Sequence, residues 1–267
     1  MTRITETSIG QLTLTTYDDG QFALPQGYFT DIPEALSAEI GDTVTIGANL
    51  WTIRSGARLI LVDTGSAEAL KTMFPDTGQA WGDLQAQTPT DIVLTHMHAD
   101  HIGGLADPAA FPGAQIHAAQ AEWDFWTDPD LISRLPEDAR PMAQMIQSVA
   151  DGIKDRVTLH DADAEIALGL TLVPLPGHTP GHVGLRLSSE GEDLLIVGDA
   201  LISDKLHFAA PEVAYAMDGD AATTIETRKA LLAEVEARGL RIAATHFAFP
   251  GMGRVTRDGA AYRFDTV

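Results

Sequence analysis

Three histidines and one aspartate stand within six positions of this chain, as His96, His98, Asp100 and His101. An apolar run over 90–94 precedes them and two glycines follow, a pattern typical of a buried strand that ends in a tight loop. Side chains alternate on extended chain, so His96 and His98 point the same way, and a turn brings Asp100 and His101 to an adjacent point. Imidazole nitrogen and carboxylate oxygen are ligands of borderline divalent metals, zinc above all. The spacing predicts a metal site rather than scattered surface histidines.

The same arrangement, a strand-like run that ends in a potential ligand, recurs at four other places. Asp63 follows 59–62, His178 follows 172–177, Asp199 follows 194–198, and His246 follows 242–245. Loops at strand ends are where a rigid scaffold displays functional side chains. One such segment is weak support for a site, but five in one domain are strong support.

Composition limits the chemistry and the partners. The chain has 267 residues, of which 45% are hydrophobic and 21% charged, an ordinary globular composition. It has no cysteine, so a metal must be held by His, Asp or Glu alone. The formal charge of -21 repels phosphate backbones and argues against a nucleic-acid partner. No apolar run approaches the ~18 residues of a membrane span, so we expect no membrane partner.

The N-terminus, Met1 to Glu6, lacks the basic start and apolar stretch of a secretory signal. This predicts a cytoplasmic protein, or a periplasmic one if a leader has been removed.

Strands and helices alternate along the chain in a way that favours layers of both. The expected strands cover 43–53, 58–63, 91–96, 115–119, 157–160, 166–174, 183–187, 194–198 and 241–246. Apolar residues at helical spacing predict a helix over 142–153, and good helix formers predict another over 221–238, with Gly239 as its stop. Such a mixture indicates a layered α/β architecture.

The chain lacks internal repeats and flexible linkers, which favours one main domain over 41–267. Residues 1–40 look irregular, with an apolar, turn-rich stretch around 24–29. We therefore expect an N-terminal arm over 1–40 and a homodimer with residues 20–35 in its interface.

The order HxHxDH, GH, GD and a late His resembles the metallo-β-lactamase superfamily of binuclear hydrolases over roughly residues 40–260. The resemblance implies an α/β (α+β) fold, a four-layer αββα sandwich, with two divalent metal ions at one edge. Zinc is the expected metal, with manganese, iron or cobalt as alternatives.

Carried onto this sequence, the resemblance assigns the metal ligands and the supporting group. His96, His98 and His178 would hold one ion, Asp100, His101 and His246 the other, and Asp199 would bridge both. Asp63 would orient a ligand imidazole rather than bind metal. Asp100 and Asp199 are then the catalytic carboxylates, and a metal-bridging hydroxide would attack an ester-like bond.

Four histidines remain, and treating all of them as ligands would overfill two metal sites. His182 is expected to make a structural hydrogen bond under its loop. His117 and His160 lie in ordinary strand patterns and are expected to be structural. His207 follows Asp199 by eight residues, so it could reach the pocket.

Departures from the patterns of individual branches of the superfamily reduce the number of branches that this sequence fits. The lack of cysteine excludes the commonest zinc β-lactamases, and His98 stands where flavodiiron oxidoreductases have Glu. Only 247–267 follows His246, too short for the helical domain that glyoxalase-II-like thioesterases append. Segments 206–208, 245–253 and 259–264 instead resemble the methyl parathion hydrolase-like branch, which hydrolyses organophosphates, lactones and aryl esters. The stretch 200–203 lacks the tyrosine that quorum-quenching lactonases usually place there.

That branch lines its pocket with aromatic and aliphatic side chains, and the local motifs nominate Phe74, Trp126, Ile202 and Phe247. An apolar pocket suits a small, neutral, hydrophobic substrate. We expect a carbon ester or lactone as native substrate, with organophosphate turnover as a side activity. Two alternatives stay open: a non-catalytic, metal-dependent binding or sensing module, and a thioester or β-lactam hydrolase.

Overall fold

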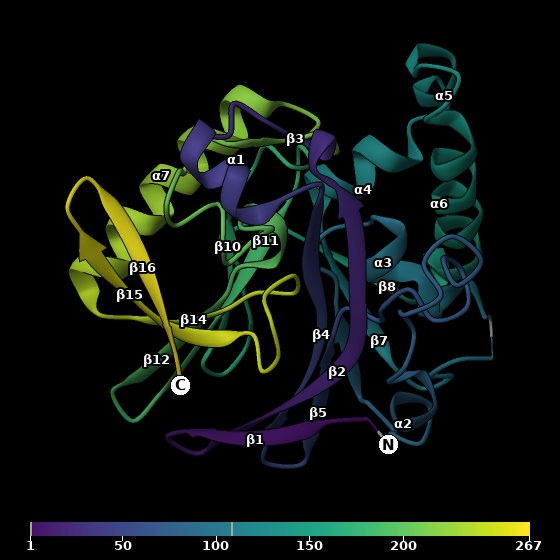
Figure 1. The fold of residues 1–267 in the computed structure, drawn as a ribbon. Coiled ribbons are helices and arrows are strands. Elements are labelled where there is room, and N and C mark those ends of the chain that lie inside the picture. The colour runs from purple at the N-terminus through teal and green to yellow at the C-terminus, as the bar shows by residue number, and fades with distance from the viewer. Residues whose placement is uncertain (1, 108) are drawn as a thin grey trace.

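Two mixed β-sheets pack face to face in the computed structural model, which describes residues 2–107 and 109–267 (Figure 1). The first sheet has the order β1-β2-β4-β5-β6-β7-β8. Its strands are β1 (Ile4–Ile9), β2 (Leu12–Pro25), β4 (Thr43–Ser55), β5 (Arg58–Val62), β6 (Asp91–Val93), β7 (Gln115–Ala119) and β8 (Val157–His160). From β5 to β8 the strands run parallel, so their carboxyl ends meet at one edge.

The second sheet has the order β16-β15-β14-β12-β11-β10-β9. Its strands are β9 (Glu165–Ala167), β10 (Leu170–Pro174), β11 (Val183–Ser189), β12 (Glu192–Ile196), β14 (Arg241–Ala243), β15 (Met252–Asp258) and β16 (Ala261–Thr266). Only β12 and β14 pair in parallel, and the other neighbours are antiparallel. A short ladder joins β3 (Phe29–Thr30) to β13 (Ala214–Tyr215).

Helices cover the outer faces of the sheets. The described helices are α1 (Glu34–Ile40), α2 (Trp81–Gln85), α3 (Ala99–Ile102), α4 (Gln120–Thr127), α5 (Leu131–Arg134), α6 (Arg140–Ile153) and α7 (Ala221–Arg238). Figure 1 shows α6 beside the first sheet and α7 beside the second, with α5 projecting beyond the body. In the described part of the chain no helix is both long and apolar enough to cross a membrane.

Burial explains this layering. Between the sheets, Trp51 and Val62 of the first pack in one cluster with Leu185 and Ile196 of the second. Outside the first sheet, Ile92 packs with Ile146 of α6, and outside the second, Ile242 packs with Leu232 of α7. The predicted αββα sandwich is confirmed. It is stabilised chiefly by removal of these apolar faces from water.

Both helices predicted from periodicity are present. α6 buries Ile146, Val149 and Ile153 on one face, as its spacing requires. α7 begins after Asp220, whose side chain accepts a hydrogen bond from the Thr223 amide. It ends at Gly239, whose φ of 61° lies in the left-handed region.

The predicted strand over 166–174 is divided in the structure. β9 and β10 pair antiparallel, and the turn between them contains Gly169, with φ 75°. Gly169 allows this turn because it has no Cβ to oppose the left-handed conformation.

The prediction of an irregular segment over 1–40 is wrong for residues 4–25. β2 pairs with β4 along nearly its whole length, from Thr13 opposite Arg54 to Pro25 opposite Thr43. Leu24 and Phe29, which motivated a dimer contact, are buried within this chain. The homodimer and the division at residue 41 remain predictions.

Candidate metal centre

Four segments at one edge of the sandwich carry the predicted ligands. His96 and His98 follow β6, and Asp100 and His101 lie in α3. The second sheet supplies the others: His178 lies between β10 and β11, Asp199 follows β12, and His246 follows β14. Because β12 and β14 run parallel, Asp199 and His246 leave the sheet at the same edge.

Three imidazoles converge in the first group of side chains. His96 Nε2 lies 3.1 Å from His98 Nδ1, which lies 2.9 Å from His178 Nε2. All three residues are buried. Nitrogen atoms this close together, from three separate rings, form the donor set that a zinc ion takes from protein.

The second group contains Asp100, His101, Asp199 and His246, with one ligand atom of each within 4.8 Å of all the others. Asp199 Oδ1 lies 3.2 Å from His101 Nε2, and Asp100 Oδ2 lies 3.4 Å from His246 Nε2. His246 is oriented from behind by its Nδ1, 3.0 Å from the carbonyl oxygen of Gly47. Its Nε2 is thereby directed at the carboxylates.

Asp199 stands between the two groups. Its Oδ2 lies 3.1 Å from His246 Nε2 and 3.3 Å from His178 Nε2, while Oδ1 faces His101. Although they are 3.2 Å apart, Oδ1 and His101 Nε2 are both buried and neither makes a hydrogen bond to any residue that the structure describes. Buried polar atoms without partners are rare in native proteins unless an ion or ligand completes them. This donor set therefore fits a pair of divalent cations.

The imidazoles of the cluster differ in the direction in which their pKa is shifted. Burial, reinforced by neighbouring imidazoles, lowers the pKa of His96 and His98 well below the ordinary value. Burial also opposes the charged form of His101, but the carboxylates of Asp199, Asp100 and Asp63 outweigh it and raise the pKa. For Asp199, burial is outweighed by the surrounding imidazoles, which lower its pKa. The cluster therefore keeps the Asp199 carboxylate anionic, as a cation site requires.

Asp63 lies behind this cluster, as the sequence predicts. Its Oδ2 is 2.8 Å from His101 Nδ1, and Thr95 donates to both of its oxygens, from the amide and from Oγ1, at 2.8 Å. Thr95 Oγ1 in turn lies 3.2 Å from His96 Nδ1. One buried carboxylate thus orients an imidazole of the second group directly and one of the first through a hydroxyl.

Glu122 is a supporting residue that sequence reasoning missed. Its buried carboxylate accepts hydrogen bonds from the Met97 amide at 2.9 Å and from Thr179 Oγ1 at 2.6 Å. Burial raises its pKa despite these donors. Met97 lies between His96 and His98, and Thr179 follows His178, so Glu122 ties together the two loops of the first group. No sequence signal distinguished it from a surface glutamate.

The remaining histidines lie outside the metal centre. His182 Nδ1 lies 3.0 Å from the Leu175 oxygen, and its Nε2 accepts from the Asp199 amide at 2.9 Å, so it makes the structural contacts predicted for it. Burial lowers its pKa to about 3. His117 lies between His160 and Asp91, at 2.9 and 3.0 Å. His207 is buried, and its Nδ1 accepts a hydrogen bond from the Ile202 amide. It does not line the cavity, so the suggestion that it reaches the pocket is wrong.

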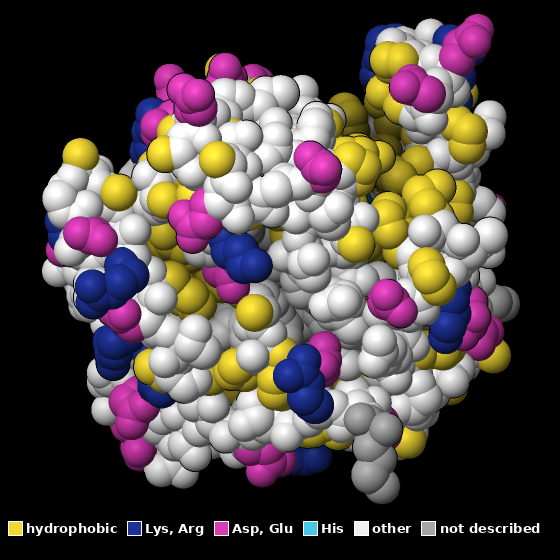
Figure 2. All heavy atoms as spheres, viewed as in Figure 1, with side chains coloured by type: hydrophobic (Ala, Val, Ile, Leu, Met, Phe, Trp, Pro, Cys, Tyr) yellow, Lys and Arg dark blue, Asp and Glu magenta, His cyan; other side chains and the backbone are white. Residues whose placement is uncertain are grey.

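A cavity opens on the metal centre and has apolar walls. His98, Asp100, His178, Asp199 and His246 form its floor. The other lining residues are Phe22, Leu24, Tyr28, Ile46, Leu70, Met73, Phe74, Ala99, Met142, Tyr215 and Met217. Figure 2 shows hydrophobic side chains gathered in a hollow between α5 and the body of the molecule. Met73 lines the cavity and is 71% exposed, so it lies where the cavity opens to solvent.

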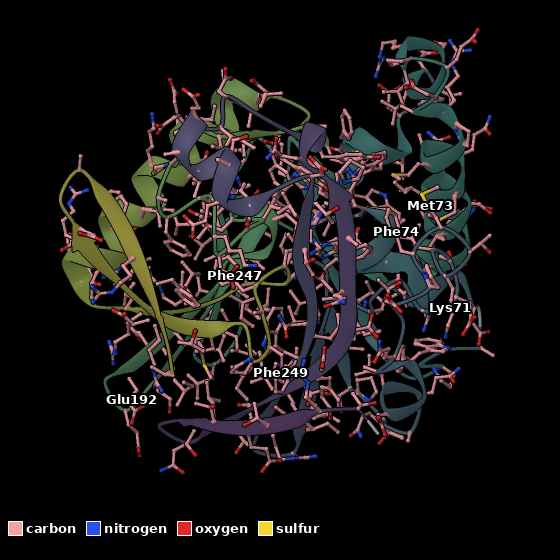
Figure 3. All side chains as sticks on the ribbon, viewed as in Figure 1. Lys71, Met73, Phe74, Glu192, Phe247 and Phe249 are labelled. Atoms are coloured by element: carbon pink, nitrogen blue, oxygen red, sulfur yellow. The ribbon has the colours of Figure 1, made fainter. Side chains whose placement is uncertain are left out.

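Of the four predicted pocket residues, only Phe74 lines this cavity. Ile202 and Phe247 are fully buried in separate apolar clusters, and Trp126 packs on His98 with its indole nitrogen bonded to Glu122. The pocket prediction is therefore wrong for those three. Figure 3 shows Phe247 on the side of the second sheet, away from Phe74 and Met73. Ile202 and Phe247 stand close to ligands in the sequence, but their side chains lie in the core behind the site rather than in the cavity wall.

Comparisons with known proteins agree with this geometry. Residues 45–246 match the family model described as the metallo-beta-lactamase superfamily. "Acyl-coenzyme A thioesterase MBLAC2" of Bos taurus is 28% identical, over 80% of this chain and 78% of its own. The chain spans about half or less of the length of several other curated relatives that it matches.

Two solved structures share the whole fold. "Hydrolase AbOPH in beta lactamase superfamily" is 28% identical with a TM-score of 0.89, covering 100% of this chain and 98% of that one. AidC, "a Dizinc Quorum-Quenching Lactonase", has a TM-score of 0.91 at 24% identity, with 100% and 98% covered, a likeness of fold alone. With the family model matching most of its length, this chain belongs to the metallo-β-lactamase superfamily.

Proposed function

We propose that this protein is a binuclear, metal-dependent hydrolase of neutral, apolar esters or lactones. The observation that carries the proposal is the apolar cavity whose floor is made of five of the candidate ligands. A substrate held by those walls would have its polar bond against the metal centre. Two metal ions, zinc in the first instance, are supported by the two groups of ligand atoms and by the unpartnered Asp199 Oδ1 and His101 Nε2.

The residues would divide the work as follows. His96, His98 and His178 hold one ion, Asp100, His101 and His246 hold the other, and Asp199 is shared. Such ions supply a water of lowered pKa and stabilise negative charge on the substrate oxygen. Asp100 is the ligand best placed to move a proton, because 21% of its side chain is exposed and it lines the cavity. We assign the Asp100 carboxylate the transfer to the leaving oxygen of the proton that the attacking water gives up.

The cavity walls favour uncharged substrates. Among the described residues that line the cavity, none is a lysine or arginine. The chain as a whole carries -21. A coenzyme A thioester, the class named for the bovine relative, brings phosphates for which the described lining offers no lysine or arginine partner. A thioesterase or β-lactamase activity is the second candidate, supported by that relative rather than by the cavity.

Trigonal carbon and tetrahedral phosphorus place different demands on the cavity, while the same metal centre serves both. We place a carbon ester or lactone first because biological phosphotriesters are scarce. Organophosphate turnover would then be a side activity.

A substrate panel tests the proposal. The zinc-loaded protein is given an acyl lactone, a neutral aryl ester, a dialkyl aryl phosphate and an acyl-coenzyme A thioester, and kcat/KM is measured for each. We expect the lactone or aryl ester to lead, with activity lost to a chelator and restored by zinc. A phosphotriester lead of more than about 100-fold, roughly 2.7 kcal/mol, would reverse our order of substrates. Absence of turnover by zinc-loaded protein would favour a binding or sensing module.

Phe74→Ala supplies the matched variant. Phe74 meets Phe22 edge-on at 5.1 Å, and Phe22 meets the ring of His246 at 5.6 Å, so this wall leads to the metal centre. Its loss should lower kcat/KM for a long-chain ester roughly tenfold, about 1.4 kcal/mol, and for a short one much less. Leu168→Ala, at a side chain 89% exposed and outside the cavity, is the control and should change neither.

A further inference from the structure

His178 is backed by a carboxylate that the sequence motifs did not indicate. Its Nδ1 lies 2.9 Å from Asp218 Oδ1, and the two side chains are 1% and 0% exposed. An ionised carboxylate can only accept a hydrogen bond. His178 Nδ1 therefore carries the proton and is the donor in the hydrogen bond to Asp218. This leaves the lone pair of His178 on Nε2, the atom that faces His98 Nδ1 at 2.9 Å.

The second oxygen of Asp218 accepts a hydrogen bond from the cavity wall and lies near a buried cation. The Tyr215 amide donates to Oδ2 at 3.1 Å, and Arg228 Nη2 lies 3.9 Å from it. The Tyr215 ring, which lines the cavity, stacks over His178 with centroids 6.2 Å apart and planes 11° from parallel. Asp218 thus joins a ligand imidazole to the wall that would contact substrate.

Arg228 extends this network to the segment that follows Asp199. Its side chain is fully buried, and it donates to the carbonyl oxygens of Ala200 at 3.0 Å and Val213 at 2.6 Å. Burial lowers the pKa of Arg228 to about 10, which leaves it a cation at neutral pH. A cation fixed by backbone carbonyls thus lies beside the Asp218 carboxylate.

Each group of ligands therefore contains one imidazole backed directly by a carboxylate. In the second group that imidazole is His101, held by Asp63, and in the first it is His178, held by Asp218. The Nδ1 atoms of His96 and His246 face neutral oxygens, those of Thr95 and Gly47. A carboxylate behind a ligand imidazole fixes its tautomer and makes the other nitrogen a stronger donor to metal.

We propose that Asp218, held in place by Arg228, is a positioning residue for the His96–His98–His178 metal site, fixing the tautomer and direction of His178. The proposal rests on the proposed function, in that it requires a metal at this group. It predicts that Asp218 controls affinity at one metal site and leaves the other nearly unchanged.

The test measures metal affinity rather than turnover. Zinc is titrated into full-length, metal-free protein against a chromophoric chelator, which resolves the two binding steps. Asp218→Asn keeps an acceptor but loses the charge, and Asp218→Ala loses both. We expect one step to weaken about tenfold in the first variant and about 100-fold in the second, with the other step changed less than threefold.

Asp220→Asn is the matched control, because Asp220 lies two residues away, caps α7 and does not contact His178. It should leave both steps unchanged. Imidazole 1H–15N spectra give a second readout: the proton of His178 should stay on Nδ1 in the wild type and redistribute in Asp218→Ala. These spectra keep the test decisive if affinity cannot be measured in a poorly folded variant.

Three outcomes are distinguishable. If the wild type does not bind two zinc ions, the proposed function fails. If it binds two and the Asp218 variants match the wild type in both steps, our inference about Asp218 is overturned. Equal weakening of both steps, with a fixed His178 tautomer, would also overturn it, because that pattern indicates general loss of stability.

Discussion

Buried carboxylates in this protein fall into two opposite electrostatic settings. Asp199 is surrounded by imidazoles that lower its pKa in spite of burial. Asp19 is 2% exposed, and its main partners are the amides of Ala80 at 2.8 Å and Gly78 at 3.3 Å. Burial dominates there and raises its pKa to about 7. The first setting prepares a cation site, while the second costs stability near neutral pH.

Asp19 gives a prediction about pH. Its pKa is about 7 in the folded protein against 3.8 for the ordinary group, so unfolding releases a proton between those values. Stability should therefore fall as pH rises from about 4 to 7 and level off above, with a slope of at most about 1.4 kcal/mol per pH unit. Asp19→Asn should remove that fall.

Urea unfolding of the metal-free protein at several pH values measures this effect as the difference between wild type and variant. Asp83→Asn, at an exposed carboxylate, is the control and should keep the wild-type slope. A wild-type slope in Asp19→Asn would contradict the assignment of the effect to Asp19.

At this scale the sequence predicted the residues that had a short motif or stood at a strand end. His96 to His101, His178, Asp199, His246 and Asp63 were all identifiable and lie together. Glu122, Asp218 and Arg228 were not, because each reaches the site from a distant element and their local sequence is that of an ordinary helix or loop. Most of the pocket residues could not be predicted, for a related reason. Tyr215 and Met142 line the cavity because tertiary packing brings them there.

At the scale of elements, the two sheets are joined at β4. The Gly47 amide donates to the His246 carbonyl at 2.9 Å, and Asn49 Nδ2 donates to the Phe247 carbonyl at 2.7 Å. A Cβ on Gly47 would lie 2.0 Å from the Phe247 oxygen, closer than any contact allows. The approach of β4 to the loop of His246 thus requires glycine, and it sets the position of a candidate ligand.

Gly47→Ala should therefore destabilise the protein by about 1–3 kcal/mol, the usual cost of overpacking. It should also weaken zinc binding at the group that contains His246. The control is Gly82→Ala in α2, where a Cβ meets nothing within 4 Å and stability should stay equal or rise by up to about 1 kcal/mol. Urea unfolding measures the stability of each variant, and its zinc content measures metal binding. Wild-type values of both for Gly47→Ala would refute this account of β4.

Elements with a clear period were predicted well, and β2, whose alternation is interrupted, was not. α6 and α7 were visible as helical patterns and caps. β2 alternates, with Leu12, Leu14, Phe22 and Leu24 buried, but the Asp18-Asp19-Gly20 interruption concealed it. In the structure, the pairing register between β2 and β4 shifts at this interruption. The pairing of β2 with β4 across this irregularity is a tertiary feature that the local sequence did not reveal.

The whole molecule adds a long-range field to the site. A formal charge of -21 surrounds a cavity whose described lining has no lysine or arginine. Such a field lowers the local concentration of anionic substrates and leaves neutral ones unaffected. On the proposed function, we therefore expect charges remote from the metal centre to contribute to substrate choice.

This field predicts a dependence on salt. For two aryl esters that share a leaving group, one neutral and one bearing a carboxylate, kcat/KM of the anionic ester should rise roughly three- to tenfold on going from low to high ionic strength. That of the neutral ester should change little. A salt-independent rate for the anionic ester would show that the global charge does not act on the cavity.

The central claim is that seven side chains form two metal sites that share Asp199. Elemental analysis after reconstitution with zinc and removal of excess ion tests it most directly. The wild type should retain two zinc ions per chain, His98→Ala should lose one preferentially, and Asp199→Asn should impair both, because it removes the shared charge. Retention of only one zinc or less per wild-type chain, or full retention in Asp199→Asn, would contradict the claim.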